Sequence, residues 1–182
     1  MIFASLGTMD MAFVRMAKAI DEWAATTQEE VIVQTGYTTF NYRHAKAFDF
    51  CTKDEMQQYI KAANILILQG GWGAISEAME QKKRIVVIPR HDKTEHIHDQ
   101  FQLIRKLDKL GCVIGVFDEK DLPQKIKEAY SFDFQQIKKG NAEKLINQKL
   151  KEWFHSRYIS AIIFQYTERL LLKYSHYIKS LL

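Results

Sequence analysis

Apolar positions along the chain alternate between short continuous runs and longer periodic stretches. Continuous runs rich in Ile, Val and Leu predict strands, whereas apolar residues that recur every three or four positions predict amphipathic helices. Strands are predicted at residues 1–6, 30–35, 46–51 (a short one), 64–69, 84–89 and 112–117. Helices are predicted at residues 12–25, 54–63, 74–81, 96–110 and 120–130.

The order of these elements predicts an α/β fold. Strands that alternate with helices at this spacing form βαβ units and an open parallel sheet. The runs ILIL at 65–68 and IVVI at 85–88 are aliphatic throughout, as in strands that are covered on both faces. Thr52 and Glu55 form a capping-box pattern before the second helix. We therefore predict a Rossmann-like open parallel sheet in a domain that spans residues 1–137.

The C-terminal part of the chain has a different pattern. Between Ile159 and Leu181 apolar residues recur in steps of three or four, which predicts one apolar stripe along a helix. Residues 138–182 hold nine Lys/Arg and three Asp/Glu, a net charge of +6, so the first 137 residues carry a net charge of −2. We predict a basic, aromatic-rich amphipathic helical tail. Three interpretations of this tail stay open: it packs on its own domain, it docks a partner, or it lies in a lipid interface.

Length, composition and charge exclude several classes of protein. With 182 residues, 47% of them hydrophobic and 26% charged, the chain fits a soluble domain with an appendage. Because the basic surplus belongs to the tail, no nucleic-acid partner is expected. Cys51 and Cys112 are too few for a disulfide framework, which favours a reducing compartment. No signal peptide and no run of about 18 apolar residues is recognised, so we expect a cytoplasmic location.

Glycines mark two turns at one edge of the predicted sheet. Gly70, Gly71 and Gly73 lie between the strand at 64–69 and the following helix, and Gly7 and Thr8 follow the first strand. Glycine permits positive φ and lets a ligand approach the backbone closely, and free N–H groups at a helix N-terminus suit phosphate. These turns predict a diphosphate cradle. The alternative for the three glycines is a plain tight turn.

Further polar candidates lie close to these turns in the predicted fold. Glu77, one turn into the helix, can accept hydrogen bonds from a ribose diol; alternatively it only interacts favourably with the helix dipole. The loop after the strand at 84–89 holds His91, His96 and His98, but the i, i+2 spacing and the lack of a nearby Cys argue against a metal site. A polar ligand such as a sugar is a better match for this loop, through Glu95, His96, Asp99 and Gln100. Walker and G-x-G-x-x-G patterns are lacking, which argues against an ATPase and a dinucleotide dehydrogenase.

The order of these motifs resembles a known family. SLGT, QTGY, GGWGAISEAME, IVVIPR and EHIHDQFQLIRKL follow one another as in the nucleotide-sugar-binding half of family 28 glycosyltransferases. The PssE-type small subunits of bacterial exopolysaccharide and capsule synthesis are especially similar, over roughly residues 1–130. The resemblance implies the donor-binding half of a GT-B fold, with a separate membrane-anchored PssD-type subunit supplying the acceptor half.

The resemblance also implies roles for individual residues. Gly70, Gly71 and Gly73, with Trp72 between them, match the loop near the donor diphosphate, Glu77 the ribose ligand, and Gln100 a contact to the donor sugar. Gly7 and Thr8 match the first phosphate-proximal turn. The implied reaction needs no metal and no cofactor and moves a hexose-type sugar from a UDP-sugar to a lipid-linked acceptor at the inner face of the plasma membrane. No convincing general base is found here, so we expect it on the partner.

Departures from the family pattern keep other interpretations open. Met9, Gln69 and Asp99 stand where relatives commonly carry histidine, Lys82 and Arg84 stand where Gly and Pro are usual, and Trp72 is bulky for its loop. These substitutions motivate a non-catalytic subunit that binds nucleotide-sugar or acts as a scaffold. Another GT-B activity, such as epimerisation of a nucleotide-sugar, normally needs both halves in one chain.

Overall fold

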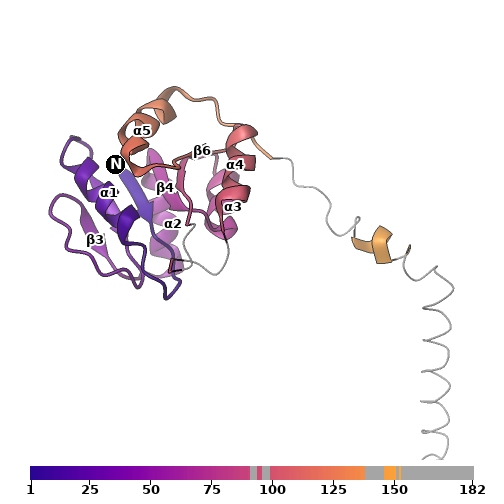
Figure 1. Cartoon of the computed structure of the whole chain (residues 1–182), viewed down its shortest axis with the longest axis horizontal. Coiled ribbons are helices and arrows are strands. Elements are labelled where there is room, and N and C mark those ends of the chain that lie inside the picture. Colours follow the sequence, from indigo (N-terminus) through magenta and orange to yellow (C-terminus); the bar gives the residue numbers. More distant parts are fainter. Residues whose placement is uncertain (91–93, 96–98, 138–145, 151, 153–182) are drawn as a thin grey trace, which may run out of the picture. The chain divides into compact units, whose positions relative to one another are not determined.

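A computed structural model of the chain describes residues 1–90, 94–95, 99–137, 146–150 and 152. The chain divides into two compact units, Met1–Ile137 and Lys138–Leu182. The first unit holds a six-stranded parallel sheet of order β3-β2-β1-β4-β5-β6 (Figure 1). Its strands are β1 (Ile2–Ser5), β2 (Val31–Gln34), β3 (Lys46–Phe48), β4 (Ile65–Gln69), β5 (Arg84–Ile88) and β6 (Ile114–Gly115). The predicted α/β, Rossmann-like fold is confirmed.

Helices cover both faces of this sheet. They are α1 (Val14–Ala24), α2 (Lys53–Ala62), α3 (Trp72–Glu80), α4 (Phe101–Lys109) and α5 (Leu122–Ser131), with a short 3-10 helix η1 (Glu119–Asp121) before α5. One apolar core joins α1 and α5 to alternate strand residues such as Ile65 and Ile67. The other core joins α2, α3 and α4 to the residues between them, such as Leu66 and Leu68. Because β4 is buried on both faces, its sequence is a continuous aliphatic run, as predicted.

The strand order creates a switch point between β1 and β4. From β1 the chain continues to β2 and β3 on one side, and it then returns to place β4 on the other side of β1. Ser5 at the end of β1 pairs with Leu68 near the end of β4. The turns that follow these two strands therefore leave the sheet side by side, the position at which open parallel sheets bind ligands.

Helix α4 begins later than its sequence pattern predicts. The predicted start at residue 96 lies outside the described residues, but Asp99 and Gln100 are described and neither is helical. Asp99 accepts the N–H of Phe101 at 2.7 Å, and the N–H of Gln100 donates to the carbonyl of Arg90 at 3.0 Å. These bonds hold both residues in a loop, so the helix begins at Phe101. The prediction of a longer helix was wrong at this end.

The observed boundaries of the other elements lie closer to the predicted ones. The capping box before α2 is confirmed, because Thr52 and Glu55 exchange hydrogen bonds through side chain and backbone. Helix α3 begins at Trp72, two residues earlier than predicted, and β6 has only two residues. In the second unit residues 146–150 are helical and exposed; the predicted stripe from Ile159 onward lies outside the described residues. Among the described helices, none combines the length and apolarity that a membrane span requires.

Candidate functional site

The turn after β4 leads into an open helix N-terminus. Gly71 is the N-cap of α3 and supplies no capping side chain. The N–H groups of the first helical turn therefore have no carbonyl partner within the helix, and they carry the positive end of its dipole. A Cβ added at Gly73 would meet nothing within 4 Å, so the space beside Gly73 is open.

The first two glycines of this turn are required by close contacts and not by an unusual backbone. Neither has a positive φ. A Cβ at Gly70 would lie 2.4 Å from Oε1 of Gln100, and a Cβ at Gly71 would lie 2.2 Å from Nε2 of Gln69. The glycines thus make room for two glutamine side chains. The positive φ that glycine permits is thus not used at Gly70 or Gly71.

The turn after β1 does need a left-handed glycine. Gly7 has a φ of +86°, and its N–H donates to Oγ of Ser5 at 3.3 Å. Its carbonyl accepts from Nε2 of Gln34 at 3.3 Å, and a Cβ at Gly36 would lie 2.2 Å from that carbonyl oxygen. Gln34 also accepts the Ser5 hydroxyl at 2.7 Å. The turn is therefore held firmly against the end of β2, while Thr8 is exposed.

Gln69 and Gln100 connect the two turns. A Cβ at Gly7 would lie 3.3 Å from Nε2 of Gln69, so the Gln69 side chain reaches from the β4 turn to the β1 turn. Nε2 of Gln100 donates to Oε1 of Gln69 at 3.0 Å. Oε1 of Gln100 accepts the N–H of Arg90 at 2.9 Å. Gln100, which was predicted to lie near a sugar, is 7% exposed, and its hydrogen bond holds the side chain of Gln69 in place.

Arg90 connects several loops through buried hydrogen bonds, a role that was not predicted from the sequence. Its guanidinium is buried and donates to the carbonyls of Leu6 at 2.8 Å, Met11 at 2.7 Å and Glu95 at 2.6 Å. It also lies 4.5 Å from the ring centroid of Phe13. Burial lowers the pKa of the Arg90 guanidinium, and the nearby Glu95 carboxylate acts in the opposite direction. Arg90 therefore holds the loop after β5 against the turn after β1. In the sequence, this role was indicated only by the position of an arginine directly after Pro89, at the end of the predicted strand.

The carboxylate of Glu95 forms a salt bridge with Arg15. Its carboxylate accepts from Nε of Arg15 at 2.8 Å and from Nη2 at 3.0 Å, and Arg15 also pairs with Glu119. This bidentate contact occupies the carboxylate that was predicted to bind a sugar. Asp99 is exposed at the start of α4, and His96 lies outside the described residues. In the free protein the Glu95 carboxylate is thus paired with Arg15, while Asp99 accepts the N–H of Phe101.

Glu77 lies on the half-buried side of α3 that faces α2. Its Oε1 accepts a hydrogen bond from Nε2 of Gln57. Gln57 in turn accepts from Gln81 at 2.8 Å, so the carboxylate is held in place from α2. Trp72, the first residue of α3, is 50% exposed.

Two exposed aromatic residues lie at the same edge of the sheet and were missed by sequence reasoning. Tyr37 follows β2 and is 58% exposed, and Phe50 follows β3 and is 51% exposed. Their rings meet edge to face with centroids 5.1 Å apart. Exposed large aromatic side chains in contact with each other form a surface suited to a planar ligand group.

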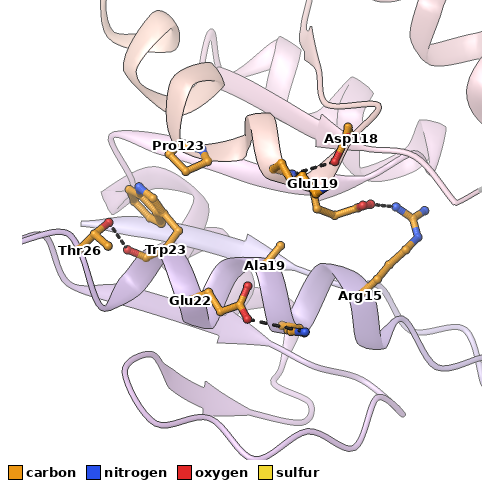
Figure 2. A pocket seen from close by; sticks show the side chains of 10 residues that line it. Arg15, Ala19, Glu22, Trp23, Thr26, Asp118, Glu119 and Pro123 are labelled. Atoms are coloured by element: carbon orange, nitrogen blue, oxygen red, sulfur yellow. Dashed lines mark hydrogen bonds and ion pairs between the residues drawn. The ribbon is translucent and has the colours of Figure 1, made fainter.

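A separate cavity of about 550 Å³ lies beside α1 (Figure 2). Its lining consists of Arg15, Lys18, Ala19, Glu22, Trp23, Thr26, Asp118, Glu119, Lys120 and Pro123. Its described lining contains none of the predicted site residues that the structure describes. Among the described residues, no cluster of three or more His, Cys, Asp or Glu side chains is arranged to hold a metal ion.

Comparison with known proteins defines the class of this fold. The chain is similar to a glycotransferase of kitacinnamycin, with a TM-score of 0.57, 17% identity, and coverage of 71% of this chain and 34% of that one. It is also similar to the glycosyltransferase SnogD from Streptomyces nogalater, with a TM-score of 0.53, 17% identity, and coverage of 70% and 34%. The fold is thus that of a domain of GT-B glycosyltransferases, and the chain spans about a third of these structures.

The sequence assigns the family within this class. The profile of the glycosyltransferase family 28 C-terminal domain matches residues 2–168, and the chain belongs to that family. No curated protein matches the chain. The predicted resemblance to family 28 glycosyltransferases is therefore confirmed at the level of the family.

Proposed function

We propose that this chain is the donor-binding, catalytic part of a glycosyltransferase that takes a hexose-type sugar from a UDP-sugar. The observation that carries the proposal is the meeting of two glycine turns at the β1–β4 switch point, one of them opening into the uncapped N-terminus of α3. Membership of the family supports sugar transfer as the chemistry. A nucleotide-sugar supplies the two phosphates that such an edge binds best.

The diphosphate lies against the first turn of α3 in this proposal. Gly73 leaves its backbone open, and the adjacent N–H groups are directed at the site of negative charge. When the bond from the sugar to the diphosphate breaks, these fixed dipoles stabilise the departing charge. Preorganised donors act in this way without a metal ion and without reorganisation.

The nucleoside lies on the α2 side of α3. Glu77 is held there by Gln57 and offers a carboxylate to the ribose hydroxyls. The exposed pair Tyr37 and Phe50 follows β2 and β3 at the same edge and offers a surface for the base. The order phosphate, ribose, base thus runs from the β1–β4 switch point toward β3.

The acceptor half comes from a second protein in this proposal. A membrane-anchored PssD-type subunit would bind a lipid-linked saccharide, supply the general base and hold this chain at the inner face of the plasma membrane. The product would be a surface polysaccharide of the exopolysaccharide or capsule type. The resemblance to PssE-type subunits supports this division.

Calorimetric titration tests donor binding. UDP and UDP-sugars should give saturable heat with the purified chain, and Glu77→Ala should weaken UDP binding by about 1–3 kcal/mol because hydrogen bonds to the ribose are lost. Glu80→Ala, which removes a carboxylate from an exposed position of the same helix, should bind UDP as the wild type does. No saturable heat with any nucleoside diphosphate or UDP-sugar would overturn the donor-binding role.

Two further outcomes separate the enzyme from a non-catalytic subunit. Donor binding with transfer only in the presence of the membrane-anchored partner supports the two-component enzyme. Donor binding without transfer, even with that partner, identifies a non-catalytic subunit, the alternative that Met9, Gln69 and Asp99 motivate. Efficient transfer to a lipid-linked acceptor by this chain alone contradicts the division of the site between two proteins.

A further inference from the structure

We infer that the cavity beside α1 binds a neutral saccharide chain, through the indole N–H of Trp23 and the polar side chains of its two walls. This site lies apart from the proposed donor site. The identity of the bound chain as the growing product rests on the proposed function, whereas its saccharide chemistry is argued from the lining residues alone.

The cavity is a groove that follows one face of α1 (Figure 2). Arg15 and Trp23 lie on this wall about 12 Å apart along the helix axis, and Thr26 extends it further. Asp118 and Pro123 stand on the opposite wall, which is formed by η1 and the start of α5. A volume of about 550 Å³ is typical of ligand sites. The extended wall suits a chain of linked units better than a compact molecule.

The indole N–H of Trp23 is an unused donor in this lining. Trp23 is 9% exposed and belongs to the core on the α1 side of the sheet, yet no described residue accepts its N–H. Among the described residues, the fully enclosed side-chain atoms without a partner belong to Tyr42 and Arg90. The indole nitrogen therefore reaches the surface, where an acceptor oxygen of a ligand would complete its hydrogen bond.

The charges of the lining balance one another. The cations are Arg15, Lys18 and Lys120, and the carboxylates are those of Glu22, Asp118 and Glu119. An anion or a cation in the groove would therefore meet as much repulsion as attraction. The Lys120 ammonium forms no ion pair with any described residue, so it remains available as a donor.

Hydroxyl groups match such a lining better than charged groups do. Each hydroxyl both donates and accepts, so one sugar ring can use the indole N–H and Lys120 as donors and Glu22 as an acceptor. Ala19 and Pro123 add apolar surface to the same groove, against which the C–H face of a sugar ring can pack. A neutral saccharide unites these properties in every unit of its chain.

One end of the groove lies at the edge of the sheet that carries the donor site. Helix α1 follows β1, so its first residues lie at the edge where the parallel strands end. Arg15 lines the groove there and also binds the Glu95 carboxylate and the Pro89 carbonyl of the loop after β5. A saccharide in the groove would thus lead from the reaction edge along α1 toward the opposite edge.

The indole signals of the full chain test binding directly. The chain holds Trp23, Trp72 and Trp153, and the Trp23 signal in nitrogen–proton correlation spectra is assigned by its loss in Trp23→Phe. Maltotriose, cellotriose and tri-N-acetylchitotriose are the neutral probes, with inorganic phosphate and glucuronate as charged ones. At least one neutral trisaccharide should shift the Trp23 signal saturably and leave the Trp72 signal in place.

Variants of exposed wall residues test the two polar contacts without altering the core. Lys120→Met and Glu22→Met should each weaken binding of that trisaccharide about fivefold, because each removes one hydrogen-bonding group. Lys61→Met makes the same change at an exposed position of α2 and should bind as the wild type does. Equal affinity of all three variants would contradict the assignment of these walls.

The remaining outcomes separate this groove from the donor site. If no neutral trisaccharide shifts the Trp23 signal, or only phosphate or glucuronate does, the inference is overturned, and calorimetry with UDP decides the donor role independently. If a trisaccharide shifts the signal but the chain binds no nucleoside diphosphate, the saccharide groove stands and the proposed function is overturned.

Discussion

At the scale of single residues, each glycine of the turn after β4 has its own physical reason. Gly70 and Gly71 leave room for the side chains of Gln100 and Gln69, whereas Gly73 borders open space. A substitution at Gly70 therefore disturbs the free protein, because Gln100 is buried there, whereas one at Gly73 meets no neighbouring atom in the free protein. This difference separates effects on folding from effects on binding.

Gly73→Ala should leave the fold intact and weaken UDP binding. The new methyl group meets nothing in the free protein, and Ala is the better helix former, so the free energy of unfolding should not fall. A diphosphate lying against this backbone would collide with the methyl group, and UDP affinity should fall at least tenfold by calorimetry. Gly70→Ala is the contrasting variant and should lower the unfolding free energy by about 1–3 kcal/mol. Unchanged UDP affinity in Gly73→Ala would show that the phosphates do not approach there.

The sequence predicted the glycine turns but not the side chains that connect them. Glycines after a strand are visible as a local pattern, and their shared edge follows from the parallel sheet. Arg15 and Glu95 are 80 positions apart, and Arg90 reaches Leu6 across 84 positions. No local pattern encodes such pairs, so Glu95 could be recognised as polar but not as the partner of an arginine. The hydrogen bond from Gln100 to Gln69 was not predictable for the same reason, because the two residues are 31 positions apart.

At the scale of elements, a single carboxylate on α1 anchors the loop between β2 and β3. Asp21 is 5% exposed and accepts the N–H groups of Arg43, His44 and Ala45 at 2.9–3.1 Å. Burial raises the pKa of the Asp21 carboxyl, but the three backbone donors outweigh it, and the pKa lies below its ordinary value. The ionised carboxylate thus stabilises the fold by holding an irregular loop on a helix.

Asp21→Ala should lower the free energy of unfolding by about 1–3 kcal/mol at pH 7, because three backbone donors lose their acceptor. A carboxyl whose pKa is depressed in the folded state contributes stability above its unfolded pKa of about 3.9 and loses it as the pH falls through the folded pKa. Urea unfolding at pH 7 and near pH 3 should therefore show the difference from wild type shrinking at the lower pH. Glu22→Ala, on the exposed side of α1, should change stability by less than about 0.5 kcal/mol at either pH. A difference that grows on acidification would contradict this role of Asp21.

The elements were predictable where the signal is local. The capping box before α2 depends on two residues three positions apart, and buried strands such as β4 need only a continuous aliphatic run. The start of α4 was not predictable, because a hydrogen bond from the N–H of Gln100 to the carbonyl of Arg90 holds Gln100 in the loop. Periodicity alone extends a helix into such a loop when polar residues happen to continue the pattern.

At the scale of the whole molecule, the sheet and its helices are complete within Met1–Ile137. A chain ending at Ile137 should therefore fold, with a melting temperature within a few degrees of the full-length value, and should lose association with the partner or with membranes. A chain ending at Phe117 is the contrasting construction: it lacks Leu122, Ile126 and Ala129, which α5 contributes to the core, and it should not fold. Circular dichroism on heating and vesicle co-sedimentation measure the two properties. Aggregation of the chain ending at Ile137 would mean that residues 138–182 stabilise the first unit.

The two outer strands of the sheet are its shortest, with three residues in β3 and two in β6. A foreign strand laid along either border would find room for very few backbone hydrogen bonds, and short borders of this kind discourage amyloid-like stacking. Recruitment of another polypeptide by lengthening the sheet is thus disfavoured. We expect crosslinks to any bound subunit to map to helices and connecting loops and to spare both outer strands.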